Sequence, residues 1–162
     1  MAGACEYSIV RLETSDDLDA VARLEAESFS NPWSREILAR DLRNPDVSRV
    51  YVLRARDGAL LAFCACWFIA DELHINTLAV KAHARRQGLA TRLLRFIFAE
   101  ASGLGIGRAT LEVRRSNEPA LKLYAALGFT VQGIRTNYYS QPVEDGLILW
   151  SHQLETETNP QP

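Results

Sequence analysis

Cysteine is scarce in this chain, and its scarcity argues against a disulfide-stabilised fold. The 162 residues include only Cys5, Cys64 and Cys66. An odd and sparse set of cysteines is typical of a reducing compartment, so we expect a cytoplasmic protein. Cys64 and Cys66 alternate on one face of an expected strand, and no further Cys or His has the spacing of a metal ligand. We therefore interpret both thiols as small buried core residues and expect no metal.

Long apolar runs and an excess of basic charge are also missing. No continuous apolar stretch reaches the length needed to span a membrane. Residues 1–7 lack the basic segment and apolar core of a secretory signal. The formal net charge is −2, and no basic stripe of the kind that nucleic-acid-binding proteins carry is seen. We therefore expect neither membrane insertion nor direct nucleic-acid binding.

The chain does contain enough apolar material for one core. Hydrophobic residues make up 48% of its 162 residues, which suits a single domain. We expect that domain to span residues 1–154, followed by a disordered polar tail over residues 155–162. No long exposed apolar stripe remains once the helices are packed, so we expect a monomer.

Hydrophobic periodicity predicts an α/β fold. Strand-like runs cover residues 8–12, 47–56, 59–69, 72–80, 106–114, 129–139 and 147–154. Helix-like runs cover residues 15–28, 34–42 and 89–102, and a fourth helix lies between Asn117 and Gly128. Antiparallel strands followed by β-α-β units predict a mixed, mostly antiparallel central sheet with helices on both faces.

Capping and turn residues mark several boundaries. Thr14 or Ser15 is expected to cap the first helix and Ser34 the second. Asp57-Gly58 between two β-rich runs predicts a hairpin. The buried face of the first helix is expected to carry Leu18, Val21, Leu24 and Phe29.

A loop rich in arginine and glycine joins an expected strand to an expected helix. Leu78–Val80 ends the strand, and Arg85–Ala90 leads into the helix. The first turn of a helix has unpaired N–H groups and a positive dipole end. Gly88 has no Cβ and lets the backbone approach a ligand closely. Together these features predict a phosphate or pyrophosphate site.

Glu112 lies in the middle of an apolar strand and is a candidate general base. Acyl transfer to an amine needs the neutral nucleophile, and a carboxylate can accept the proton directly or through a water. The alternative is a charge that lies on a solvated face or that pairs with an arginine such as Arg114.

Tyr124 and Asn117 belong to the fourth expected helix. Tyr124 is a candidate general acid that would protonate a leaving thiolate, and the alternative is an amphipathic core residue. Asn117 is either a hydrogen-bond partner of a ligand or a plain helix N-cap.

The loop Arg85-x-x-Gly88-x-Ala90 resembles the acyl-CoA pyrophosphate loop of the GNAT (GCN5-related) N-acetyltransferases. The resemblance extends over roughly residues 8–150 and becomes specific in several segments. Leu111-Glu112-Val113-Arg114, Ala120-Leu121-x-Leu123-Tyr124, Asn137-Tyr138-Tyr139 and Phe29-x-x-Pro32-Trp33-Ser34 are similar to the RimI-type protein N-terminal alanine acetyltransferases.

The resemblance implies roles for particular residues. It places the catalytic glutamate at Glu112 and the catalytic tyrosine at Tyr124. It implies that Trp33, Tyr138 and Tyr139 contact the peptide substrate. The acetyl-CoA contacts that it implies are Leu78, Ala79, Val80, Arg86, Gln87, Gly88, Leu89, Ala90, Thr91 and Asn117.

The function that the resemblance implies is transfer of acetyl from acetyl-CoA to the N-terminal alanine of a small-subunit ribosomal protein. One alternative keeps the fold and acetylates lysine side chains or a small-molecule amine. Another alternative, of a different class, is a CoA-binding module without catalysis. The presence of both Glu112 and Tyr124 argues against the module.

Overall fold

The computed structural model describes residues 6–154 and contains seven strands, four α-helices and one 3₁₀ turn. The strands are β1 (Tyr7–Arg11), β2 (Ser48–Ala55), β3 (Leu60–Ile69), β4 (Glu72–Val80), β5 (Arg108–Arg114), β6 (Thr130–Tyr139) and β7 (Glu144–Ser151). The helices are α1 (Leu18–Ser28), α2 (Arg35–Leu42), α3 (Leu89–Gly103) and α4 (Glu118–Ala126), and the 3₁₀ turn η1 is Ala82–Ala84.

The strands form one mixed sheet in the order β1-β2-β3-β4-β5-β7-β6, which confirms the predicted α/β architecture. The described chain packs as two compact units, one of residues 6–66 and 77–94 and one of residues 67–76 and 95–154. One domain over residues 1–154 stays a prediction, and the tail expected over residues 155–162 lies outside the described residues.

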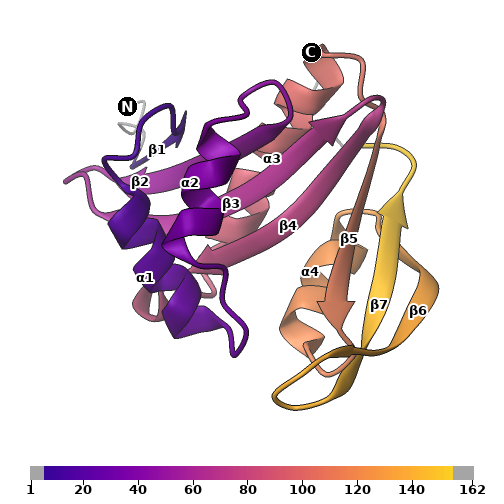
Figure 1. Cartoon of the computed structure of the whole chain (residues 1–162). Helices are drawn as coiled ribbons and strands as arrows, with labels where there is room; N and C mark the ends of the chain where they lie inside the picture. Colours follow the sequence, from indigo (N-terminus) through magenta and orange to yellow (C-terminus); the bar gives the residue numbers. More distant parts are fainter. Residues whose placement is uncertain (1–5, 155–162) are drawn as a thin grey trace. The chain divides into compact units, whose positions relative to one another are not determined.

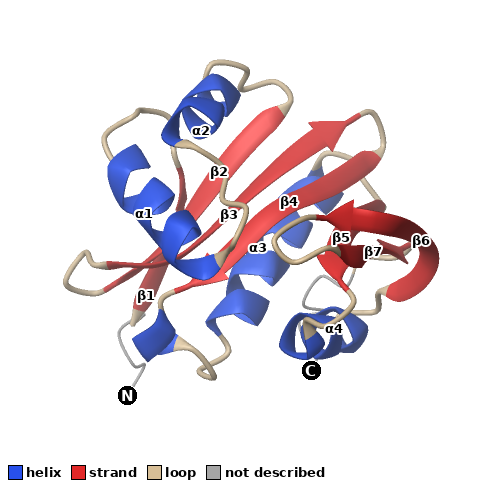
Figure 2. Ribbon diagram, turned by 60° about the horizontal axis from the view of Figure 1, so that its bottom comes forward, coloured by secondary structure: helices blue, strands red, loops and turns tan. Residues whose placement is uncertain are grey.

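In the first unit, α1 and α2 pack on one face of β2, β3 and the end of β4. The shared core joins the apolar sides of both helices to the sheet through Leu18, Val21, Leu24, Leu38, Val50, Val52, Phe63, Ala65 and Ala79. Figures 1 and 2 show the start of α3, residues 89–94 of the same unit, on the opposite face of these strands. Cys64 and Cys66 are free and fully buried in β3, as predicted.

In the second unit, β5 pairs antiparallel with β7, which pairs antiparallel with β6. The parallel ladder between β4 and β5 runs from Glu72↔Arg108 to Ile75↔Leu111. Packing beside these strands includes the aromatic rings of Phe98, Tyr124 and Phe129.

Several boundaries confirm the local signals in the sequence. The Ser34 side chain accepts a hydrogen bond from the Ile37 N–H at 3.3 Å and caps α2. In the β2–β3 hairpin, Asp57 Oδ1 accepts from the Ala59 N–H at 2.9 Å, and Gly58 has a φ of +90°. The Asp-Gly pair therefore forms the turn that the hairpin needs.

The first helix ends at Ser28 as predicted, but it differs from the prediction at its start and in one residue of its buried face. It begins at Leu18 with Asp17 as N-cap residue, without a capping hydrogen bond from that side chain, so neither Thr14 nor Ser15 caps it. The Asp17 carboxylate instead pairs with the Arg54 guanidinium. Phe29 follows the helix in extended conformation and is exposed, so it does not belong to the buried face. A long-range ion pair has here replaced the local cap.

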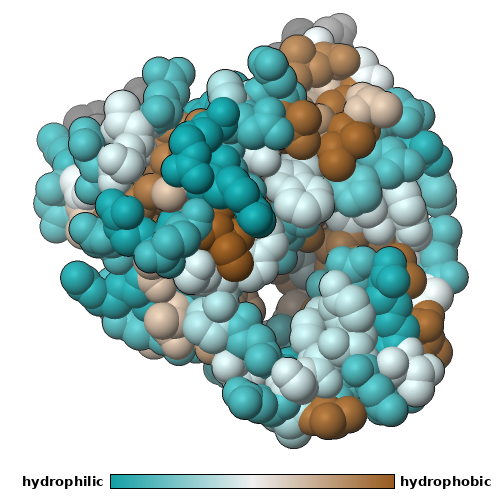
Figure 3. All heavy atoms as spheres, in the orientation of Figure 1, coloured by the Kyte–Doolittle hydropathy of each residue, from teal (hydrophilic) through white to brown (hydrophobic). Residues whose placement is uncertain are grey.

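Strand β6 ends the strand order and carries exposed apolar side chains. Val131, Ile134 and Tyr138 are each about half exposed, and register shifts fall between Val131 and Gly133 and between Arg135 and Tyr139. Such irregularities protect an edge strand against pairing with other chains. Apolar surface in the view of Figure 3 is broken into separate patches. Residues 6–154 include no helix long and apolar enough to cross a membrane.

Candidate active site

The arginine-glycine loop leads from the end of β4 into the N-terminus of α3. Arg86 and Gly88 have positive φ values of 63° and 76°. The Arg85 Nε donates to the Val80 carbonyl oxygen at 3.1 Å, and the Arg92 N–H donates to the Gly88 carbonyl oxygen at 3.0 Å. The first-turn N–H groups therefore follow an exposed cationic loop, an arrangement that can bind a phosphate group.

The residues predicted to contact acetyl-CoA along the chain from β4 to α3 all lie in the first unit. Leu78 and Val80 are partly exposed on one face of β4, and Ala79 is buried on the other. Arg86, Gln87 and Gly88 are exposed, Leu89 is buried, and Ala90 and Thr91 are partly exposed. The accessible members of the set are those that a ligand at the helix N-terminus can reach.

Glu112 lies on β5 in the second unit, with its side chain 36% exposed. Its Oε1 is 3.4 Å from the Nε of Arg135 on β6. The sequence suggested Arg114 as the partner, and this was wrong, because the Arg114 guanidinium pairs with Glu144. The exposed ion pair leaves the Glu112 carboxylate accessible to a proton donor.

Tyr124 is buried in α4, with 5% of its surface exposed. Its ring packs edge-on against Phe129 at a centroid distance of 5.5 Å, and Phe129 lies 6.1 Å from Phe98. The ring therefore packs as an amphipathic core residue, which was the alternative that the sequence offered for Tyr124. The role of its hydroxyl as a general acid stays a prediction.

Asn117 is the N-cap of α4, as the second interpretation of its sequence position predicted. Its Oδ1 accepts from the Ala120 N–H at 3.3 Å, and Pro119 stands at the start of the helix. The cap uses the amide oxygen, so a contact with CoA would use the amide nitrogen. That contact stays a prediction.

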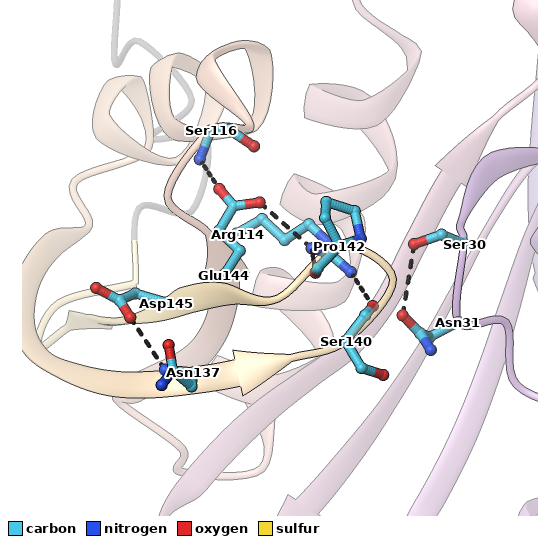
Figure 4. A network of polar contacts seen from close by, with 9 residues as sticks. All are labelled: Ser30, Asn31, Arg114, Ser116, Asn137, Ser140, Pro142, Glu144 and Asp145. Atoms are coloured by element: carbon cyan, nitrogen blue, oxygen red, sulfur yellow. Dashed lines mark hydrogen bonds and ion pairs between the residues drawn. The ribbon is translucent and has the colours of Figure 1, made fainter.

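Arg114 organises the connection between β6 and β7 (Figure 4). Its guanidinium donates to the carbonyl oxygens of Ser140 and Pro142, both at 2.9 Å, and lies 3.3 Å from the Glu144 carboxylate. Glu144 also accepts from the Ser116 N–H, and these hydrogen bonds lower the pKa of its carboxyl below the ordinary value. One cation thus anchors the β6–β7 turn to the end of β5.

The tyrosine pair lies beside this anchor. The Tyr138 and Tyr139 rings meet edge-on at 5.0 Å, and the Arg114 guanidinium lies 4.5 Å from the centre of the Tyr139 ring. Burial, with smaller contributions from Tyr138 and the Glu112 charge, raises the pKa of Tyr139 to about 12. Its hydroxyl is therefore a proton-bearing hydrogen-bond donor at neutral pH, while Tyr138 is half exposed and open to a ligand.

Asn137 places this pair through an unusual backbone conformation. Its φ is 53°, and its N–H donates to Asp145 Oδ1 at 3.0 Å. Asparagine tolerates the left-handed region better than most residues. The Asn-Tyr-Tyr segment therefore leaves the regular strand just before the two aromatic rings.

Trp33 belongs to the first unit, in the loop between α1 and α2. Its N–H donates to Glu25 Oε1 at 3.1 Å, and Glu25 Oε2 accepts from Thr77 Oγ1 at 2.6 Å. Burial raises the pKa of the Glu25 carboxyl, and the hydrogen bonds from Thr77 and Trp33 oppose that rise. The sequence did not single out Glu25, although an acidic residue beside Leu24 on the buried face of an amphipathic helix was a signal of it.

The predicted site residues thus fall into two sets. The first unit holds the loop and strand expected to contact acetyl-CoA, together with Trp33, and the second holds Glu112, Asn117, Tyr124, Tyr138 and Tyr139. No group of His, Cys, Asp or Glu side chains suited to a metal ion is found over residues 6–154.

Comparison with known proteins agrees with these features. A family model described as Acetyltransferase (GNAT) family matches residues 18–129. A protein of Bacillus subtilis strain 168, provisionally named ribosomal protein bS18-alanine N-acetyltransferase, is 37% identical over 142 residues, which cover 87% of this chain and 93% of the relative. The ribosomal protein bS18-alanine N-acetyltransferase of Escherichia coli K12 is 34% identical over 139 residues, covering 86% and 90%.

The fold is similar to a solved structure as well. The crystal structure of the ribosomal-protein-S18-alanine N-acetyltransferase from Escherichia coli superposes with a TM-score of 0.82 at 30% identity. The match covers 96% of this chain and 99% of that structure.

Proposed function

Because this chain belongs to the GNAT acetyltransferase family, we propose that it acetylates the N-terminal alanine of a small-subunit ribosomal protein. That it is an acetyltransferase follows from the family and from its relatives. GNAT enzymes use acetyl-CoA as the acetyl donor. The observation that carries the proposed acceptor is the 34–37% identity, over 86–87% of this chain, to relatives named for bS18-alanine. With this substrate, the enzyme would work in the cytoplasm, where the ribosomes are.

Acetyl-CoA is proposed to bind along the first unit. The backbone of Leu78–Val80 would pair with the pantetheine arm, and the loop over Arg86–Gly88 with the first turn of α3 would hold the pyrophosphate. The positive φ of Gly88 and the exposed arginine support this assignment. Asn117 would hydrogen-bond CoA through the amide nitrogen that its cap does not use.

The chemical step is direct transfer from sulfur to nitrogen. Glu112 accepts a proton from the peptide amine, directly or through a water, and the amine attacks the thioester carbonyl. A backbone N–H near Val80 stabilises the oxyanion. The new C–N bond forms, the C–S bond breaks, and Tyr124 protonates the departing thiolate. An α-amine has a pKa near 8 and a lysine near 10.4, so a weaker base is enough to deprotonate the α-amine.

The peptide is proposed to be recognised by aromatic side chains. Tyr138 is half exposed, and the Tyr139 hydroxyl keeps its proton at neutral pH. Trp33 would contribute from the α1–α2 loop. The anchor from Arg114 to the β6–β7 turn supports this role, because it holds the segment that carries the tyrosine pair.

Mass spectrometry of two peptides tests the proposal. One peptide begins with alanine and contains internal lysines, and the other is identical but N-terminally blocked. We expect acetyl-CoA to modify only the free N-terminus of the first. Lysine acetylation in both peptides would instead support the lysine or small-amine alternative, and binding of acetyl-CoA without product would support the non-catalytic module.

A further inference from the structure

Glu25 is a buried carboxylate that the proposed reaction does not use. Only 2% of the residue is exposed, and its neighbours on the inner face of α1 include Val21 and Leu24. No cationic side chain among residues 6–154 pairs with it. Burying a carboxylate in such surroundings costs free energy unless hydrogen bonds compensate the loss of water. The hydrogen bonds of Glu25 therefore indicate what the residue does.

Both oxygens of this carboxylate are engaged, and by different elements. Oε2 accepts from Thr77 Oγ1 on β4 at 2.6 Å, and Oε1 accepts from the Trp33 N–H at 3.1 Å. Thr77 directly precedes Leu78, the first residue of the segment proposed to pair with pantetheine. The carboxylate therefore links the α1–α2 loop to the strand on which acetyl-CoA is proposed to lie.

The other end of the same loop is the C-terminus of α1, where the main chain of Glu25 takes part in the last helical hydrogen bond. Its main-chain oxygen accepts from the Phe29 N–H at 3.1 Å, while its side chain binds the N–H of Trp33. Ser34 then caps α2. The exposed residues between Phe29 and Trp33 thus begin at the last turn of α1 and end at a contact with the Glu25 carboxylate, and only the second of these two contacts needs a glutamate at position 25.

We propose that Glu25 is a positioning residue, which with Thr77 fixes the Phe29–Ser34 loop against β4 and thereby sets the affinity for the peptide acceptor. The inference rests on the proposed function. It assigns neither proton transfer nor acetyl-CoA binding to Glu25. Its effect should therefore appear in the KM for the peptide rather than in kcat.

Thr77→Val is the sharpest test, because it removes the hydroxyl and keeps the β-branched shape. We expect the KM for the alanine peptide to rise by about 5- to 10-fold, the range that corresponds to the net contribution of one typical hydrogen bond. We expect kcat and the Kd for acetyl-CoA to stay within about twofold, as befits a residue outside the chemical step. Thr77→Ser retains the hydroxyl and should restore the KM.

Thr110→Val is a matched control for lost stability. Thr110 and Thr77 are both 8% exposed on a strand, and Thr110 Oγ1 donates a single hydrogen bond to the Leu149 carbonyl oxygen at 2.9 Å. Its loss should lower the melting temperature without raising the peptide KM. An equal rise of KM in both variants, or no rise in Thr77→Val, would overturn the inference.

Fluorescence provides a readout that does not need turnover. In a Trp67→Phe, Trp150→Phe background, Trp33 is the remaining tryptophan of the chain. Thr77→Val should increase acrylamide quenching of Trp33, whereas Thr110→Val should leave it unchanged. Unchanged quenching in Thr77→Val would contradict the anchor itself. If quenching increases in Thr77→Val but the wild-type protein acetylates no free N-terminus, the anchor is supported, and both the proposed function and the link of the anchor to peptide affinity are contradicted.

Discussion

The carboxylate of Glu112 and the guanidinium of Arg135 lie 3.4 Å apart, although their strands β5 and β6 are separated by β7. The pair reaches across β7, and both side chains are at least one-third exposed. Exposed ion pairs contribute about 1 kcal/mol or less to stability. The carboxylate is therefore held in place weakly and is available for chemistry.

Glu112→Gln should abolish most of the activity while leaving the fold intact. We expect kcat to fall by about 10²- to 10⁴-fold, as loss of a general base does. The free energy of unfolding should change by less than about 1 kcal/mol. Steady-state kinetics and urea unfolding measure the two effects. Arg135→Gln breaks the same ion pair but keeps the carboxylate, so its kcat should stay near that of the wild type; an equal loss in both variants would reject Glu112 as the base.

Arg114→Ala should release the β6–β7 turn. The variant loses two hydrogen bonds to main-chain oxygens and the contact with Glu144, and we expect a loss of about 2 kcal/mol in unfolding free energy. The KM for the peptide should rise, because Tyr139 loses the cation beside its ring. Arg115→Ala is the control, since that side chain is exposed and lies 4.0 Å from its nearest carboxylate. Equal behaviour of the two variants would contradict the anchor.

Gly88→Ala should weaken acetyl-CoA binding through backbone strain. A Cβ at this position meets no atom within 4 Å, so crowding is not the cause. The φ of +76° costs about 1–2 kcal/mol for a residue with a Cβ, and we expect the Kd measured by calorimetry to rise by about tenfold. Gly103→Ala, where the φ is not positive, should bind normally. Wild-type affinity in Gly88→Ala would exclude the loop from the pyrophosphate site.

The raised pKa of Tyr139, about 12, predicts a loss of stability at alkaline pH. The folded state holds the phenolic proton more tightly than the unfolded state, whose tyrosine titrates near 10. The protonated Tyr139 therefore makes its full contribution to the free energy of unfolding below pH 10, and this contribution is lost as pH rises from 10 to 12. Unfolding free energies of the wild type and Tyr139→Phe should be compared over this range. The unfolding free energy of the wild type should decline more steeply with pH than that of Tyr139→Phe. Parallel curves would contradict the raised pKa of Tyr139.

Local signals in the sequence predicted much of this fold. The groups that bind Ser34, Asn117 and Asp57 lie within three residues of them, so a short stretch of sequence contains both partners of each hydrogen bond. The start and the cap of the first helix were wrong, and there Asp17 pairs with Arg54, 37 residues away. No local pattern encodes a partner at that distance.

In the candidate site, too, local sequence patterns were informative and long-range contacts were not. Motif spacing indicated Glu112, Tyr124 and the arginine-glycine loop, whose environment could then be described. The ion-pair partner of Glu112 was not predicted, since Arg135 and not Arg114 lies beside it. Glu25 was not singled out either, and it is bound by Thr77, 52 residues away. Such pairs depend on strand order and register, which only the folded chain supplies.

The Arg114 anchor reaches the β6–β7 turn through carbonyl oxygens, not side chains. Every amino acid at positions 140 and 142 has such an oxygen, so the anchor places no direct demand on which residues stand there. A different side chain at position 140 would leave its hydrogen-bond acceptor in place. The cation of Arg114 therefore follows the path of the main chain and is indifferent to the chemical character of the side chain at that position.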